Sequence, residues 1–365
     1  MTMPATRRTY LDVLRGVTVL IMIEAHVIDS WTRASDRGTN AFRESLIFGG
    51  FAAPLFLFLA GVAVAMSAGS KVRRGADEGA AATAAAKRGL QIFALAFVFR
   101  FQSYLLSRAP AWSMLKVDIL NIMGPAMIAA AALWWLLRNP RARVAGFLVA
   151  TLAFVLMTPV IRHLPGLEVL PDPLEAYLRP IPGLTNFAFY PWVAFLMAGG
   201  ALGVILDGAH DGRLDRRVNL GCLAIGPMIA VVAYQASFLP PLHPRSGFWT
   251  TSISFFFIRL GLMIAAVGAA WLWEQRPSAG RRWSPLQMLG RSSLFVYWVH
   301  VELVYGSISI PLHKAFPWWG ACVGVVLVCA LMTWLTYLKG IVKRKYLSNH
   351  DLRGKLSSQA QPLMF

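Results

Sequence analysis

The stretch Tyr10–Trp31, YLDVLRGVTVLIMIEAHVIDSW, decides the fold of this chain because it joins the length of a membrane span to several ionisable side chains. Its apolar residues favour a helix that crosses a bilayer. Each ionisable side chain in the hydrocarbon layer costs at least a few kcal/mol of free energy, so a span that keeps several is predicted to serve a functional site. The ionisable residues are Asp12, Arg15, Glu24, His26 and Asp29.

Arg15 and His26 fall on one face of this predicted helix. Eleven residues at about 100° each return to nearly the same direction, and the helical rise separates the two side chains by about 16 Å. One face therefore carries a guanidinium near one membrane surface and an imidazole several turns away. Asp29 and Ser30 follow His26 by three and four residues, so they are predicted to orient its ring.

The composition excludes a soluble domain. The chain has 365 residues, of which 57% are hydrophobic and 14% charged, and its formal net charge is +18. The basic residues lie in short gaps between apolar runs, which indicates topology signals and contact with anionic lipid or a phosphorylated ligand rather than nucleic acid. Cys222, Cys322 and Cys329 lie inside apolar segments without metal-ligand spacing, so core positions and no metal are expected.

The predicted fold class is an all-α integral membrane protein with about ten transmembrane helices around a polar cavity. It forms a single domain over residues 1–365, with spans between about 10 and 338 and a basic cytoplasmic tail at 339–365. The predicted spans are about 10–29, 46–68, 88–107, 117–137, 143–162, 186–206, 218–238, 251–273, 291–310 and 317–338.

The distribution of Lys and Arg predicts the orientation of the spans. With the N-terminus inside, the inner segments carry about 23 basic residues and the outer loops about 9, so both termini are predicted to be cytoplasmic. The longest outer connection, residues 162–185, is rich in proline. It is predicted to be either an ordered loop or a short interfacial helix or lid.

Polar residues on several spans are predicted to share one depth. The set at middle to outer depth comprises Arg100, Gln102, Asp118, Asn121, Asn186 and Arg259. They indicate either a polar cavity or a structural ion-pair network, for instance Asp118 with Arg100 or Arg259. The ninth span, LGRSSLFVYWVHVELVYG, places Ser293, Tyr297 and His300 on one face at helical spacing.

Four segments carry a resemblance to a known family. Arg15 and His26 within LDxLRG…H resemble the first-helix signature of the transmembrane acyltransferase superfamily. The segments Gly49–Ser67, Phe189–Gly203 and Leu289–His300 resemble the heparan-alpha-glucosaminide N-acetyltransferase catalytic-domain family, and the last also resembles the Ser/Tyr/His helix of acyltransferase-3 proteins. The paired arginines of acyltransferase-3 proteins are not reproduced, since Lys87 and Arg88 are adjacent instead.

This resemblance implies a membrane acyltransferase that uses acetyl-CoA. It implies that His26 is the catalytic histidine and that Arg15 belongs to the acyl-donor site. The hypothesis is transfer of an acyl group from cytoplasmic acyl-CoA to a hydroxyl or amine of a carbohydrate or other acceptor on the outer side. The catalytic set is His26, Asp29, Arg100 and Arg259, the donor-binding set is Arg15, Lys87, Arg88, Ser293, Tyr297 and His300, and the acceptor-binding set is Asp118 and Asn121.

Two other function classes remain as alternatives. Buried His, Asp and Arg residues are also typical of proton-coupled transporters or permeases, although no inverted repeat is evident. A non-catalytic membrane scaffold would leave the clustered buried charges unexplained. A bacterial inner membrane is the expected location, membrane lipid is an expected partner, and a homodimer stays open.

Overall fold

The described part of this chain is built mainly from helices. The computed structural model describes the backbone of residues 7–107, 110–276 and 284–359, and the side chains of those ranges as far as residue 344. The α-helices are α1 Thr9–Trp31, α2 Asn40–Gly49, α3 Ala52–Arg73, α4 Glu78–Ser107, α5 Ile119–Leu136, α6 Pro140–Arg162, α7 Asp172–Leu178, α8 Phe189–Gly208, α9 Gly212–Ala236, α10 Phe248–Thr251, α11 Ile253–Glu274, α12 Pro285–Arg291, α13 Ser293–Tyr305 and α14 Trp318–Gln359. Short 3-10 helices are η1 Ala34–Asp36, η2 Ala111–Leu115, η3 Leu167–Val169 and η4 Ser307–Leu312.

The helices confirm an all-α, multi-pass membrane protein. Within the described ranges, 8 helical segments are long and apolar enough to cross a membrane, with α2 and α3 counted as one segment. The sequence predicts about ten spans. Two of the predicted spans are not among these eight segments. One of them, α1, has 23 residues but carries several charged side chains. The other, predicted at 291–310, is divided into the 13 residues of α13 and the 3-10 helix η4, because the helix stops at Gly306.

Two connections between the predicted spans are partly helical. The alanine-rich segment before the third predicted span joins α4, which begins at Glu78 and runs for 30 residues. The proline-rich connection 162–185 contains η3 and α7, so it holds a short helix. Its end pairs with the start of α5, since Val117 N–H donates to Leu184 O at 2.8 Å and Asn186 N–H donates to Val117 O at 2.9 Å. The basic tail from residue 339 continues α14 to Gln359, and residues 360–365 lie outside the described ranges.

Glycines allow two pairs of helices to touch through their backbones. A Cβ on Gly199 of α8 would lie 1.9 Å from Phe58 O of α3, and one on Gly61 would lie 1.9 Å from Leu196 O. α1 and α12 cross in the same way, because a Cβ on Gly16 would lie 2.0 Å from Leu286 O. The second crossing holds α12, which ends just before α13 begins, against the part of α1 that carries Arg15.

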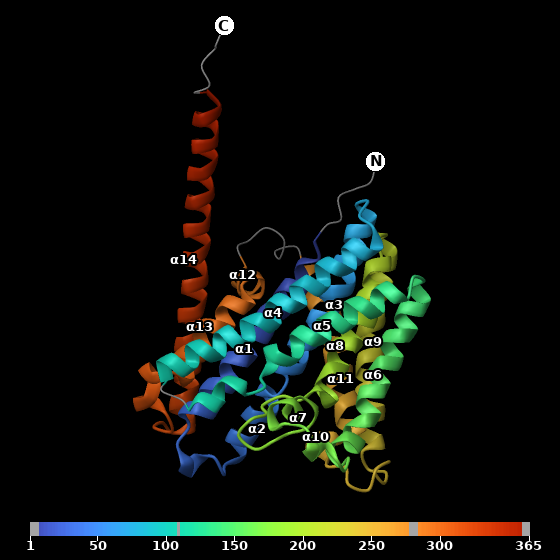
Figure 1. The fold of residues 1–365 in the computed structure, drawn as a ribbon, viewed down its shortest axis with the longest axis vertical. Helices are drawn as coiled ribbons and strands as arrows, with labels where there is room; N and C mark the ends of the chain where they lie inside the picture. Colours follow the sequence, from blue (N-terminus) through green and yellow to red (C-terminus); the bar gives the residue numbers. More distant parts are fainter. Residues whose placement is uncertain (1–6, 108–109, 277–283, 360–365) are drawn as a thin grey trace.

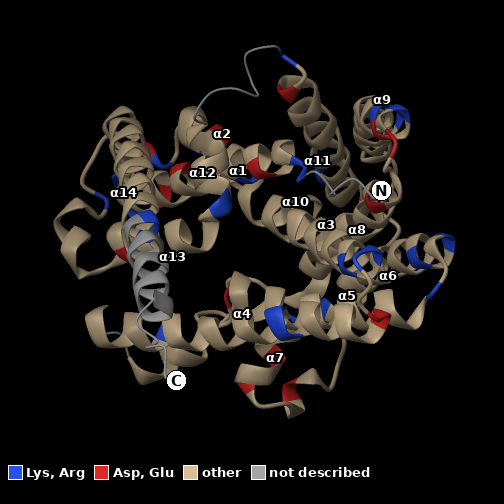
Figure 2. Cartoon of the chain, turned by 90° about the horizontal axis from the view of Figure 1, so that it is seen from above, with Lys and Arg blue, Asp and Glu red and all other residues tan. Residues whose placement is uncertain are grey.

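The helices are arranged so that α1 begins and α14 ends at the same end of the molecule (Figure 1). The short helices α2, α7 and α10 lie at the opposite end, and α14 extends well beyond the other helices (Figure 1). Seen from above, α1 and α12 lie together on one side of the centre, and α4 runs along the other side (Figure 2). Most buried apolar residues belong to one core built on α3, α5 and α8, which supports the walls of a cavity.

Candidate functional site

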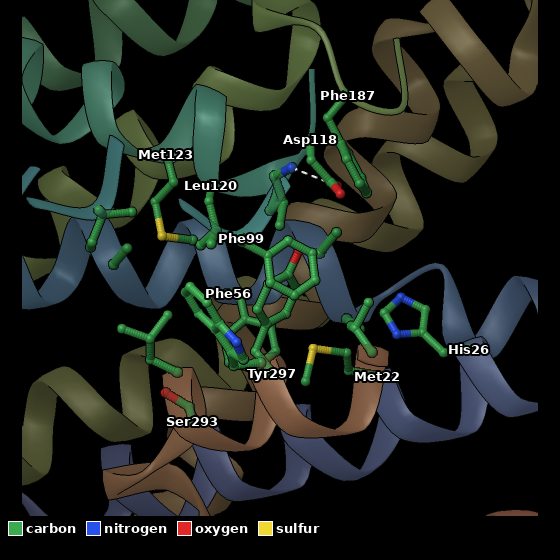
Figure 3. A pocket seen from close by; sticks show the side chains of 18 of the residues that line it. Met22, His26, Phe56, Phe99, Asp118, Leu120, Met123, Phe187, Ser293 and Tyr297 are labelled. Atoms are coloured by element: carbon green, nitrogen blue, oxygen red, sulfur yellow. Dashed lines mark hydrogen bonds between the residues drawn. The ribbon is translucent and has the colours of Figure 1, made fainter. Parts of the chain in front are cut away.

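A large cavity lies between α1, α3, α4, α5 and α13 (Figure 3). Its volume is about 1490 Å³, which exceeds the range of roughly 300–1,000 Å³ that is typical of pockets for a single small ligand. Residues far apart in the sequence meet at its wall. The predicted site residues that line it are Arg15, His26, Asp29, Arg88, Arg100, Asp118, Asn186, Ser293 and Tyr297.

Two imidazoles are paired at one end of this cavity. His26 Nδ1 lies 2.8 Å from His300 Nε2, and the two rings stack with centroids 5.1 Å apart and planes 7° apart. His26 lines the cavity, whereas His300 is fully buried behind it at 0% exposure. The second nitrogen of His300, Nδ1, lies 2.6 Å from the carbonyl oxygen of Val296, one turn earlier in α13. We call His26 and His300 the imidazole pair.

The Val296 carbonyl fixes which ring nitrogens carry protons. A carbonyl only accepts, so His300 Nδ1 carries a proton and donates it. In the neutral ring, His300 Nε2 then has a lone pair and accepts from the Nδ1–H of His26. Nε2 of His26 is left with its lone pair, which is the form that a general base requires.

The side chain of Asp29 is placed differently from the prediction. Tyr305 Oη donates to Asp29 Oδ2 at 3.2 Å, and Arg37 approaches the other oxygen at 3.5 Å. The Tyr305 ring meets the His26 ring edge-on, with centroids 5.5 Å apart. Ring nitrogen Nδ1 of His26 is therefore oriented by His300 and not by Asp29 as predicted, because α13 brings a second ring closer to it. Asp29 reaches His26 only through Tyr305.

Arg100 and Asp118 form an ion pair on the cavity wall. Asp118 also caps α5, because its carboxylate accepts from Ile119 N–H at 2.8 Å while Asn121 Oδ1 accepts from Asp118 N–H at 3.0 Å. Asn121 Nδ2 lies 3.3 Å from Tyr177 Oη of α7. The ion-pair alternative holds for Arg100 and Asp118, and these contacts join α4, α5 and α7 beside the cavity.

Four of the cations that line the cavity form a group that we call the basic cluster. They are Arg15, Arg88, Arg291 and Lys339. Arg291 Nε donates to Asp12 Oδ2 at 3.1 Å, and Arg15 approaches the same carboxylate at 3.5 Å. Lys339 Nζ lies 4.3 Å from the centre of the Phe295 ring. Since both ion pairs of the cluster use the single carboxylate of Asp12, the cluster keeps excess positive charge.

A family comparison identifies the class of protein. The model of the heparan-alpha-glucosaminide N-acetyltransferase catalytic domain matches residues 7–234, which run from α1 into α9. This chain belongs to that family. It is therefore a member of a family of membrane acetyltransferases, as its resemblance implies. A comparison with curated proteins gives no match.

The family match covers some of the predicted site residues and not others. It includes Arg15 and His26, the two residues on which the first-helix signature depends. It ends before Arg259 and before α13, so the imidazole pair joins a residue inside the matched region to one outside it. The described residues hold no cluster of three or more His, Cys, Asp or Glu side chains that could bind a metal ion.

Four predicted residues lie away from the cavity surface. Lys87 is on the exposed face of α4, and Asn121 is buried in the cap of α5. His300 is buried behind His26. Arg259 lines a separate, smaller pocket, with its guanidinium 4.0 Å from the centre of the Phe255 ring.

The structure also brings residues to the cavity that the sequence analysis missed. Lys116, Arg291, Tyr305 and Lys339 all line it. Burial lowers the pKa of Lys116, and the Arg100 cation lowers it further. Tyr305 follows Tyr297 by eight residues on α13, so helical spacing alone could have found it. Arg291 ends α12 and Lys339 begins the basic stretch of α14, and basic residues at such positions look like topology signals.

Proposed function

We propose that this chain transfers an acetyl group from acetyl-CoA on the cytoplasmic side to an amine or hydroxyl of a carbohydrate acceptor on the outer side. One observation carries the proposal: a single cavity is lined both by the basic cluster and by His26. Its volume of about 1490 Å³ leaves room for parts of two substrates. Transfer of an acetyl group from donor to acceptor needs both substrates in one cavity, because their reacting atoms must meet while water is excluded.

The basic cluster would hold the phosphates of the donor. Arg15 and Arg291 present guanidinium groups that suit phosphate oxygens, and Arg88 and Lys339 add two more cations. The acyl-bearing arm would then extend along α1 toward His26, over a rise of about 16 Å. Ser293 and Tyr297 line the cavity along α13 and would contact this arm.

His26 would act as the general base. Its Nε2 takes the proton of the acceptor amine or hydroxyl while the acceptor heteroatom attacks the thioester carbonyl. The carbon–sulfur bond breaks, and the proton returns from His26 to the departing thiolate of CoA. His300 is a positioning residue in this scheme, because its Nε2 holds the proton-bearing nitrogen of His26. An acetyl-His26 intermediate is a second route that uses the same lone pair.

Arg100 would stabilise the oxyanion that forms at the thioester carbonyl. It lines the cavity near Asp118 and is about one-seventh exposed, with a side-chain exposure of 14%. Its ion pair with Asp118 fixes the guanidinium in place, which is the preorganisation that oxyanion stabilisation needs. Asp118 and Asn186 line the same part of the wall and would contact the acceptor.

The proposed orientation rests on the basic-residue asymmetry. More basic residues fall in segments on the N-terminal side of the membrane than in the opposite loops, which supports cytoplasmic termini. A bacterial inner membrane is the location that we propose. The basic cluster then faces the cytoplasm, where acyl-CoA is made.

Binding of acetyl-CoA labelled with ¹⁴C in the acetyl group tests this function directly. We expect purified protein in nanodiscs to bind the label saturably, and to pass it to methyl α-glucosaminide, the neutral sugar amine suggested by the family name. A proton-coupled transporter or a scaffold would bind no acetyl-CoA. Absence of saturable binding by folded protein would overturn the proposal.

A further inference from the structure

A second pocket lies beside the main cavity and is lined by two arginines. Its volume is about 170 Å³, too small for a sugar ring with its substituents but sufficient for one ionic group. Arg162 reaches it from the end of α6 and Arg259 from α11. Thr185, Asn186 and Trp192 line both this pocket and the main cavity, so the two spaces share a wall. We call it the arginine pocket.

Arg162 and Arg259 differ from the other arginines whose side chains the structure describes. Each of the others is either exposed or engaged in an ion pair with Asp or Glu. The Nε atoms of Arg162 and Arg259 are buried and have no hydrogen-bond partner. The Phe255 ring, 4.0 Å from the Arg259 guanidinium, compensates only part of one charge. Two half-buried cations without a carboxylate favour an external anion.

We infer that the arginine pocket binds an anionic group, a carboxylate or a sulfate, carried by the acceptor. This assignment rests on the proposed acetyl transfer, since it concerns the acceptor of that reaction. Guanidinium groups donate paired hydrogen bonds to such planar or tetrahedral oxyanions. The hydroxyls of Thr250 and Ser252 also line the pocket and can add donors.

A short path of contacts connects the arginine pocket with His26. A Cβ on Gly50 would lie 3.3 Å from a terminal nitrogen of Arg259, and a Cβ on Gly49 would lie 2.6 Å from Cβ of Ala25. Ala25 precedes His26 in α1, and both glycines line the main cavity. An acceptor that lies over Gly49 and Gly50 can present its amine or hydroxyl to His26 and its anionic group to Arg259.

Three matched acceptors test the assignment. They are methyl α-glucosaminide, its 6-O-sulfate, and a disaccharide in which the α-glucosaminide is linked to glucuronate. We expect the two anionic acceptors to show KM values about tenfold lower than the neutral one, the size of one good charge-assisted contact. Arg162→Gln and Arg259→Gln should raise those KM values to that of the neutral acceptor.

Control variants separate a lost contact from a damaged fold. Arg162→Lys and Arg259→Lys keep the charge and should retain part of the preference. Arg245→Gln removes an exposed arginine from the connection between α9 and α10 and should retain all of it. Equal KM values for neutral and anionic acceptors in an active wild-type protein would overturn the assignment.

Binding of free anions tests the pocket without any acetyl transfer. We expect sodium sulfate to bind wild-type protein in phosphatidylcholine nanodiscs, and Arg162→Gln or Arg259→Gln to weaken this binding at least fivefold. If the sulfate binding holds and no acceptor is acetylated, the proposed function fails while the anion site stands. Adding phosphatidylglycerol to the nanodiscs separates a lipid headgroup from an acceptor group. Loss of sulfate binding and of acceptor preference in that lipid would overturn the acceptor assignment in favour of a lipid phosphate.

Discussion

The basic cluster and His26 of the imidazole pair line the same cavity, but their side chains are held in place by different interactions. The basic cluster consists of four long side chains, of which only Arg15 and Arg291 pair with a carboxylate, that of Asp12, so the cluster retains excess positive charge. The imidazole pair consists of two stacked rings with defined tautomers, anchored to a backbone carbonyl. The first arrangement can adapt to a flexible charged ligand, whereas the second fixes one nitrogen in one direction. The difference indicates that the basic cluster binds the donor and that His26 takes part in the reaction.

Removing the reactive ring should give the largest effect. His26→Ala should lower kcat by about a thousandfold or more, since general acid–base catalysis contributes roughly 10²–10⁴ in rate. The acetyl-CoA dissociation constant should change less than threefold, because His26 is remote from the basic cluster. Steady-state kinetics and isotope binding measure the two quantities. His210→Ala, an exposed histidine between α8 and α9, is the matched control. Full activity of His26→Ala would remove the imidazole from the mechanism.

Removing the second ring should give a smaller effect in the same direction. His300→Ala should lower kcat by about 10–100-fold, the usual effect of losing a group that orients a functional histidine. His300→Gln keeps an oxygen acceptor and should recover part of that loss. The pH profile distinguishes positioning from packing, since loss of the partner should shift the acidic limb, on which protonation of His26 abolishes activity. An unchanged profile with a simple loss of folded protein would mean that His300 only fills space.

Weakening the basic cluster should affect the donor alone. Arg15→Ala should raise the KM for acetyl-CoA about tenfold, equivalent to about 1.4 kcal/mol, and leave the acceptor KM unchanged. Arg138→Ala removes an exposed arginine at the turn between α5 and α6 and serves as the control. If Arg15→Ala changes acceptor selectivity more than donor affinity, the assignment of the basic cluster to the donor is wrong.

A substitution at a helix–helix contact outside the cavity should lower stability without selectively changing donor or acceptor binding. Gly199→Val would place side-chain atoms against Phe58 O, where even a Cβ would lie 1.9 Å away. Overpacking of this kind costs about 1–3 kcal/mol. We expect a lower thermal unfolding temperature, with kcat and both KM values of the remaining folded protein within a few-fold of wild type. Gly208→Val, where a Cβ meets nothing within 4 Å, should leave the unfolding temperature unchanged.

Periodicity predicted much of the fold and part of the site. Eleven residues of helical spacing place Arg15 and His26 on one face, and both line the cavity. The spacing within one helix cannot give the rotation of α13 against α1, which depends on the backbone contacts of Gly16 at the α1–α12 crossing. The sequence therefore assigned the ring contact of His26 to Asp29, a neighbour on the same helix, instead of His300.

The sequence also could not predict which charged residues form ion pairs. Asp118 had two predicted partners, Arg100 and Arg259, at similar depth. Packing of α4 against α5 selects Arg100, and α11 carries Arg259 to the wall of the arginine pocket. Depth follows from position along a helix, but the choice among residues at one depth depends on which helices are neighbours.

Sealed vesicles of known orientation test the central claim most directly, namely that the donor enters at the basic cluster and the acceptor at the imidazole pair. With the N-terminus facing the lumen, ¹⁴C-acetyl-CoA loaded inside should label methyl α-glucosaminide added outside. The same acetyl-CoA added outside should give no product, and His26→Ala vesicles should give none from either side. Equal labelling by external acetyl-CoA in intact vesicles would contradict the account.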